Sequence, residues 1–167
     1  MTSRLLGCRR PGLALRVASS RPVALLLVLL VLCSCSAGRK VRQAFGGTLP
    51  IEVQVADTAN DNSPVAVDLL LLYDKKLVED LLKMPASEWF QKKQQYIADH
   101  PAVVVESWEW VPGQIVDPFK LSYRSGAVNV VLFADYQNEG VHRAVVGPPK
   151  PFRIVLGERD LSIEVPQ

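Results

Sequence analysis

The sequence predicts a mainly β fold, an antiparallel β-sandwich of about eight short strands with two helices inserted between the second and third strands. Three observations support this prediction. Apolar residues alternate with polar ones in most segments, turn-forming residues separate those segments, and a helical period occurs only between Tyr73 and Pro101.

Residues 1–34 are interpreted as a secretory signal peptide and are left out of the fold. Five arginines and no acidic residue precede Pro22, and residues 23–32 then form an unbroken apolar run. At ~1.5 Å per residue this run is too short to cross a hydrocarbon core of ~30 Å as a helix. The pattern is typical of a signal peptide, and a longer, tilted span that extends back through Pro22 is the alternative.

The end of the apolar run resembles the lipobox of bacterial lipoproteins, in which a leucine stands three residues before the lipidated cysteine and a small residue stands directly before it. Leu32, Ser34 and Cys35 fit this pattern. Cys33 does not fit as the lipidated residue, because Leu32 would then occupy the small position. Cleavage before Cys35 would remove both other cysteines, so we expect neither a disulfide nor a thiolate metal site, and an acyl group on Cys35.

The mature chain is expected to consist of a lipidated flexible tether, residues 35–48, and one periplasmic β-sandwich domain, residues 49–167. Of 19 basic and 17 acidic residues, five basic ones and no acidic one lie in the signal peptide, which leaves a net charge of −3. This mildly acidic balance gives no reason to expect nucleic-acid binding. In the lipoproteins that the lipobox resembles, Asp after the lipidated cysteine favours retention in the inner membrane. Ser36 therefore favours the periplasmic face of the outer membrane.

The first half of the domain contains two predicted strands and two predicted helices. In residues 49–57 apolar and polar side chains alternate, which predicts a strand with one solvent-exposed face. Residues 65–73 are apolar enough for a central strand, in which Asp68 interrupts one apolar face. The polar segment between them is predicted as a loop. Apolar residues then follow a helical period over residues 74–83 and 86–100, where Asp74 is the expected N-cap and Pro101 ends the second helix.

The second half returns to the period of strands. Six more strands are predicted at residues 103–110, 115–123, 127–136, 142–146, 152–156 and 161–165, separated by turns such as Pro112-Gly113.

The sequence offers no convergent set of catalytic residues. His100 and His142 are far apart, and Glu106 and Glu109 would face opposite sides of a regular strand, so they could not flank one glycosidic bond. We therefore expect no enzyme, no cofactor and no metal. Trp108 and Trp110 share one face of a predicted strand and form either packing surface or a platform for a sugar.

The order of these features resembles the outer-membrane lipoproteins of type VI secretion systems, the TssJ or SciN family. The resemblance rests on Pro64-Val65, Tyr73, the Pro112-Gly113 turn, residues 130–135 and residues 142–146. Two departures are the helical region, which lacks the family's Phe-rich stretch, and His142, where Trp is frequent. The resemblance implies a transthyretin-like sandwich, anchored in the outer membrane by acyl chains. It also implies binding to the periplasmic part of an inner-membrane secretion component.

The loop between the first two strands is the first candidate for partner binding, because it is polar and rigidly flanked by apolar strands. Its candidate residues are Asp57, Thr58, Asn60, Asp61, Asn62 and Ser63. Alanine at Asn60, Asp61 and Asn62 is expected to weaken partner capture without unfolding the domain. Residues 136–142 form the second candidate loop.

Two other functions remain open at this point. A periplasmic lipoprotein that binds carbohydrate or peptidoglycan would need Trp108 and Trp110 to be exposed. A pilus-biogenesis or other assembly lipoprotein would instead bind its partner along an edge of the sandwich.

Overall fold

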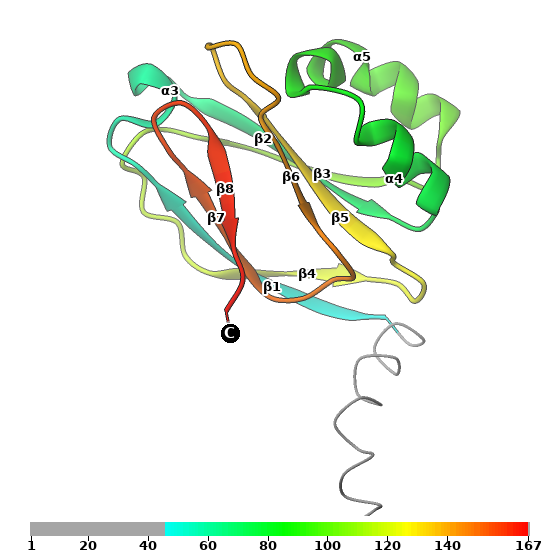
Figure 1. Ribbon diagram of the computed structural model, residues 1–167. Coiled ribbons are helices and arrows are strands. Elements are labelled where there is room, and N and C mark those ends of the chain that lie inside the picture. Colours follow the sequence, from blue (N-terminus) through cyan, green and yellow to red (C-terminus); the bar gives the residue numbers. More distant parts are fainter. Residues whose placement is uncertain (1–45, 167) are drawn as a thin grey trace, which may run out of the picture. The chain divides into compact units, whose positions relative to one another are not determined.

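The computed structural model describes residues 46–166, and the structural statements below concern this part of the chain. Two four-stranded sheets lie face to face, in the orders β4-β1-β7-β8 and β3-β2-β5-β6 (Figure 1). The strands are β1 (Gly47–Val55), β2 (Val65–Leu72), β3 (Val104–Trp110), β4 (Phe119–Tyr123), β5 (Asn129–Asp135), β6 (Arg143–Val146), β7 (Phe152–Leu156) and β8 (Leu161–Glu164). The helices are α3 (Ala59–Asn62), α4 (Lys75–Leu81) and α5 (Ala86–Asp99).

The predicted β-sandwich with a two-helix insertion is confirmed, because α4 and α5 lie between β2 and β3. The predicted signal peptide and the lipidation site at Cys35 lie outside the described residues. β1 begins at Gly47, so the last two residues of the predicted tether belong to the sheet.

β2 is the central strand that its apolar sequence predicts, since it pairs with β3 on one side and β5 on the other. Val67, Leu69 and Leu71 face the core between the sheets, whereas Leu70 and Leu72 face the helices. Because both faces are covered, both must be apolar.

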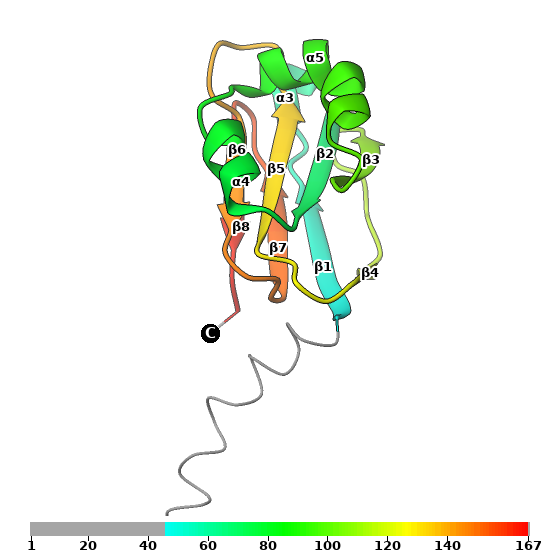
Figure 2. The same ribbon diagram turned by 90° about the vertical axis from the view of Figure 1, so that its right-hand side faces the viewer.

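α4 and α5 cover the outer face of the sheet that contains β2 and β5 (Figures 1 and 2). Asp74 caps α4 as predicted, and its carboxylate accepts a hydrogen bond from the Lys76 backbone N–H at 2.9 Å. Trp89 of α5 stacks on Phe133 of β5, with ring centroids 5.2 Å apart. The helices therefore give the sandwich a second apolar core.

Asp68 is the polar residue that interrupts the apolar pattern of β2, and its side chain is 1% exposed beneath α5. Its carboxylate accepts hydrogen bonds from Trp89 Nε1 at 2.8 Å and from Lys93 Nζ at 3.0 Å. A buried carboxylate is tolerated only with such partners. Asp68 thus fixes α5 on the sheet.

Apart from shifts of one or two residues at strand ends, two differences from the predicted strands have a structural cause. β1 and β7 pair in parallel, although only antiparallel pairs were predicted. β4 begins at Phe119, not at Ile115, because Pro118 has no N–H for a continuous ladder. Ile115 forms only an isolated bridge with Gln54 and is 94% exposed.

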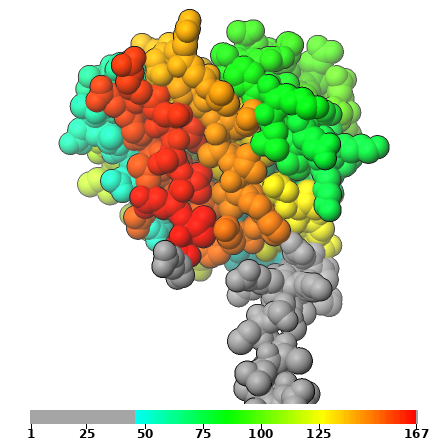
Figure 3. Space-filling view, in the orientation of Figure 1, coloured from blue at the N-terminus to red at the C-terminus, as the bar shows by residue number. Residues whose placement is uncertain are grey.

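The sandwich has two ends, a proximal and a distal one. The proximal end is where β1 begins and β8 ends, and the distal end is where β1 ends and α3 lies (Figures 1 and 2). The edge strands β6 and β8 lie side by side along one flank, as their adjoining orange and red surfaces show (Figure 3).

Candidate partner-binding surface

Three of the connections at the distal end, residues 56–64, 136–142 and 157–160, contact one another there. The backbone N–H groups of Asn60 and Asp61 donate to Gly157 O at 3.3 Å and Glu158 O at 3.2 Å. The two predicted candidate loops therefore lie in one surface, together with the β7–β8 turn.

The β1–β2 connection was predicted as an irregular loop, but it contains the short element α3, whose backbone is left-handed. The φ angles of Asn60, Asp61 and Asn62 are 49°, 50° and 63°. Asn and Asp adopt this conformation more readily than other non-glycine residues, since their short side chains form local hydrogen bonds. The sequence "NDN" thus specifies a compact turn at the tip of the loop.

Asn60 joins the first candidate loop to the second. Its side-chain Oδ1 accepts a hydrogen bond from the Gln137 backbone N–H at 2.7 Å. Its Nδ2 donates to Pro64 O at 2.8 Å and, more weakly, to Asp135 O at 3.5 Å. Because Asn60 is only 2% exposed, it holds the surface together from beneath.

The other predicted binding residues are more accessible than Asn60. Ser63 is half-buried, and the exposed ones are Asp57, Thr58, Asp61 and Asn62. Because Asn60 is buried and hydrogen-bonded, we expect alanine at this position to disturb the loop itself, whereas Asp61 and Asn62 can be tested as contact residues. The sequence could not show this, since the partner of Asn60 lies 77 residues away.

His142 organises the second loop, a role that the sequence did not reveal. It is 5% exposed, its φ is 41°, and its ring stacks on Tyr136 at 4.9 Å. Nδ1 lies 3.0 Å from Asp160 Oδ1, and Nε2 lies 2.8 Å from Asn138 O. The imidazole therefore fixes the β5–β6 connection against the β7–β8 turn.

Tyr136 adds a further link between these two connections. Its hydroxyl donates a hydrogen bond to Gly157 O at 3.1 Å. Burial, followed by the nearby Asp160 carboxylate, raises the pKa of Tyr136 well above the ordinary value for tyrosine. The phenol stays protonated and keeps donating throughout the physiological pH range.

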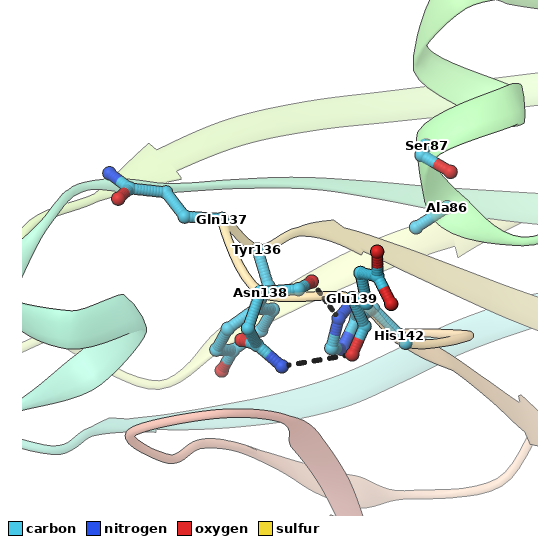
Figure 4. A pocket seen from close by; sticks show the side chains of 8 residues that line it. Ala86, Ser87, Tyr136, Gln137, Asn138, Glu139 and His142 are labelled. Atoms are coloured by element: carbon cyan, nitrogen blue, oxygen red, sulfur yellow. Dashed lines mark hydrogen bonds between the residues drawn. The ribbon is translucent and has the colours of Figure 1, made fainter.

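The distal surface is hollowed in two places. One hollow of about 330 Å³ lies between the candidate loops and includes Glu109 and Asp135. The other, of about 190 Å³, lies between the β5–β6 connection and the start of α5, and Figure 4 shows His142 beside Asn138 and Glu139 there. Fixed hollows lined by polar groups suit recognition of a protein surface.

The pair of tryptophans on β3 is not available as a sugar platform. Trp110 is 4% exposed and stacks on Trp108, with ring centroids 5.6 Å apart. Trp108 is half-buried and packs on Phe119 of β4. The two rings close the flank of the sandwich, which counts against the carbohydrate-binding alternative.

Within residues 46–166 there is no cluster of three or more His, Cys, Asp or Glu side chains arranged to hold a metal ion. In the same part of the chain, no helix has the length and apolar character needed to cross a membrane.

Comparison with known proteins shows which proteins share this architecture. No protein-family profile and no curated protein sequence matches the chain. Solved structures do match. Lip of Serratia marcescens, a membrane-bound component of the type VI secretion system, superposes with a TM-score of 0.57 at 14% identity over 73% of this chain and 99% of its own.

Two further structures agree. The type VI secretion lipoprotein TssJ1 of Pseudomonas aeruginosa has a TM-score of 0.57 at 14% identity and covers 73% of this chain and 98% of its own. The chain has the TssJ fold. A chain of a type VI membrane complex also matches, with a TM-score of 0.53 at 15% identity over 70% of this chain and 97% of its own.

Proposed function

We propose that this protein is a lipoprotein of a type VI secretion system, anchored in the outer membrane, that binds the periplasmic part of an inner-membrane component. The observation that carries the proposal is the rigid distal surface of a TssJ fold, at the end of the sandwich opposite the start of β1. The lipobox at Cys35 and the expected tether before β1 support the membrane anchor.

The anchor and the domain have separate tasks in this proposal. Acyl chains on Cys35 hold the protein at the membrane, and several chains anchor durably where a single one binds marginally. The tether enters at the proximal end, so the distal surface is free to meet a partner that extends across the periplasm. The protein acts by recognition and catalyses no reaction.

The preformed conformation of the loops at the distal surface favours partner recognition. Asn60 and His142 hold the loops in one conformation before the partner arrives. A surface ordered in advance loses less conformational entropy on binding, which improves affinity without any additional contact. We infer that Asp61 and Asn62, exposed at the tip of the left-handed turn, contact the partner directly.

The test replaces Asp61 and Asn62 together by glycine, which removes both side chains and tolerates the left-handed backbone. Capture of the periplasmic domain of the inner-membrane component should fall about tenfold or more, since exposed contact residues at an interface centre contribute this much. The matched control replaces Ser125 and Lys150, both exposed at the proximal end, by glycine. Equal capture by the two variants would refute the proposed contact surface.

The lipid anchor needs its own measurement. Mass spectrometry of the mature N-terminus should find an acylated Cys35, and a Cys35→Ala variant should leave the outer-membrane fraction. A Cys35→Ala variant that still partitions into the outer membrane would contradict the anchor.

An assembly lipoprotein that binds along a strand edge is the second candidate. β3 pairs only with β2, so its other edge is open over Val104–Trp110. A proline at Ser107 would block strand addition at this edge. Partner capture that depends on this edge, and not on Asp61 and Asn62, would favour the second candidate.

A further inference from the structure

The proximal end of the domain carries a group of exposed cations. We call Lys75, Lys76, Arg124 and Lys150 the proximal basic surface. They lie on three connections, which follow β2, precede β5 and follow β6. These strands are neighbours in one sheet, and the pairs Leu72↔Asn129 and Val130↔Val146 place the three connections at the same end.

The lysines of the proximal basic surface differ in their pairing from three other lysines of the domain. Lys83, Lys92 and Lys93 each contact a carboxylate, at 3.4, 2.7 and 3.0 Å. Among the described residues, no carboxylate lies within ion-pair distance of Lys75, Lys76 or Lys150. These three lysines therefore form no ion pair within the described part of the domain.

Two of these lysines also occupy positions that helix stability disfavours. Lys75 and Lys76 lie in the first turn of α4, which contains no acidic residue after the cap. Positive charge near a helix N-terminus opposes the helix dipole. The folding of α4 therefore gives no reason for these two cations.

Arg124 is held in place at the same end. Its guanidinium lies 4.4 Å from the centre of the Tyr73 ring, and Nη2 donates to Ala102 O at 3.3 Å. These contacts leave part of the guanidinium exposed. The acidic residues near the surface are Asp74, whose carboxylate caps α4, Glu79 in the second turn of α4, and Asp99 at the end of α5. Among the described residues none of the three lies within ion-pair distance of the four cations.

The distal end has the opposite charge. Its carboxylates outnumber its cations, Arg143 and Arg159, and comprise Asp57, Asp61, Glu109, Asp135, Glu139, Glu158 and Asp160. The domain thus has a basic end next to the tether and an acidic end away from it. Near a negatively charged surface, such a charge distribution turns the basic end inward.

We propose that the proximal basic surface contacts the headgroups of anionic phospholipids in the membrane that anchors the chain. The inference rests on the proposed function, because it assumes that the tether leads to a membrane. Electrostatic attraction acts over a Debye length of ~8 Å and would set the orientation once the domain approaches.

The orientation has a consequence for the partner. With the proximal end on the lipid, the acidic distal surface points into the periplasm and is repelled by the headgroups. Arg39, Lys40 and Arg42 in the tether would strengthen the same attraction.

The experiment measures vesicle binding by the mature chain in which Cys35→Ser removes the acyl anchor. Co-sedimentation compares vesicles of phosphatidylcholine with vesicles that contain phosphatidylglycerol in equal amount. We expect binding to the anionic vesicles at least about tenfold stronger than to the neutral ones, and its loss at high salt. Equal binding to both kinds of vesicle would overturn the proposal.

Three variants assign the binding to the domain. The first, Lys75→Gln, Lys76→Gln and Lys150→Gln, should lower binding to anionic vesicles about tenfold. The second, Lys83→Gln, Lys92→Gln and Arg159→Gln, removes the same charge elsewhere and should lower it about twofold at most. The third variant, Arg39→Gln, Lys40→Gln and Arg42→Gln, changes only the tether. If the first variant binds anionic vesicles as well as the second does, the proximal basic surface is not the contact. The same conclusion follows if the third variant loses all vesicle binding.

The failure of this inference can be told apart from failure of the proposed function. Partner capture in solution should be unchanged in the variant of Lys75, Lys76 and Lys150. If partner capture requires Asp61 and Asn62 but vesicle binding is unchanged when the three lysines are replaced, only the lipid contact is refuted. If vesicle binding holds while no inner-membrane component is captured, the proposed function is refuted instead.

Discussion

The two ends of the sandwich are built in different ways. The distal end is held by buried polar side chains, Asn60 and His142, which join connections far apart in the sequence. The proximal end carries cations that are mostly exposed and without carboxylate partners, such as Lys75 and Lys150. Buried hydrogen bonds fix a shape, whereas exposed charges supply attraction without shape. The distal end therefore suits a specific protein partner, and the proximal end suits the lipid surface that we propose.

The largest effect is expected at Asn60. Asn60→Ala leaves the Gln137 N–H without its acceptor and places alanine at a positive φ, so the free energy of unfolding should fall by roughly 3 kcal/mol. Urea unfolding measures this change. Asn62→Ala is the control, since it carries only the backbone strain and should cost about 1 kcal/mol. Similar losses in both variants would mean that Asn60 does not hold the two loops together.

A smaller effect is expected at His142. His142→Phe can keep the stack on Tyr136 but loses both ring-nitrogen contacts, to Asp160 and Asn138, so unfolding should become easier by about 2 kcal/mol. Thermal denaturation checks the stability, and partner capture checks the surface. The exposed neighbour Val141 provides the control, since Val141→Ala should change stability by less than about 0.5 kcal/mol. If His142→Phe captures the partner as the wild type does, the second loop is not part of the binding surface.

At the proximal end the expected loss is smaller again. Arg124→Gln removes the contact with the Tyr73 ring and the hydrogen bond to Ala102 O, which together should contribute about 1 kcal/mol. Urea unfolding measures the loss against Lys120→Gln, an exposed residue of β4 that makes no ion pair among the described residues. A loss as large as that of Asn60→Ala would remove the contrast between the two ends.

The smallest effect has the opposite sign. Lys75→Glu places an acidic residue at the start of α4, where it favours the helix dipole, so stability should rise by a few tenths of a kcal/mol. Lys83→Glu, just beyond the other end of α4, also loses a contact with Asp80 and should lower stability slightly. Chemical unfolding of both variants gives the comparison. A fall in stability for Lys75→Glu would show that this lysine supports the fold.

The sequence by itself determined most of the secondary structure. Period-2 alternation depends only on neighbouring residues, so the eight predicted strands correspond to those observed. The same local information located both helices and the cap at Asp74. Asp68 was visible as an interruption in an apolar strand, although only the fold supplied its partners Trp89 and Lys93.

The tertiary structure decided what no local pattern encodes. The parallel pairing of β1 with β7, the inward position of Asn60 and the role of His142 all depend on strands or loops distant in sequence. The placement of charged residues at one end or the other arises in the same way, because strand direction assigns each connection to one end. Local periods follow from backbone geometry over a few residues, whereas these contacts follow from which strands pair, and that choice is made by the core as a whole.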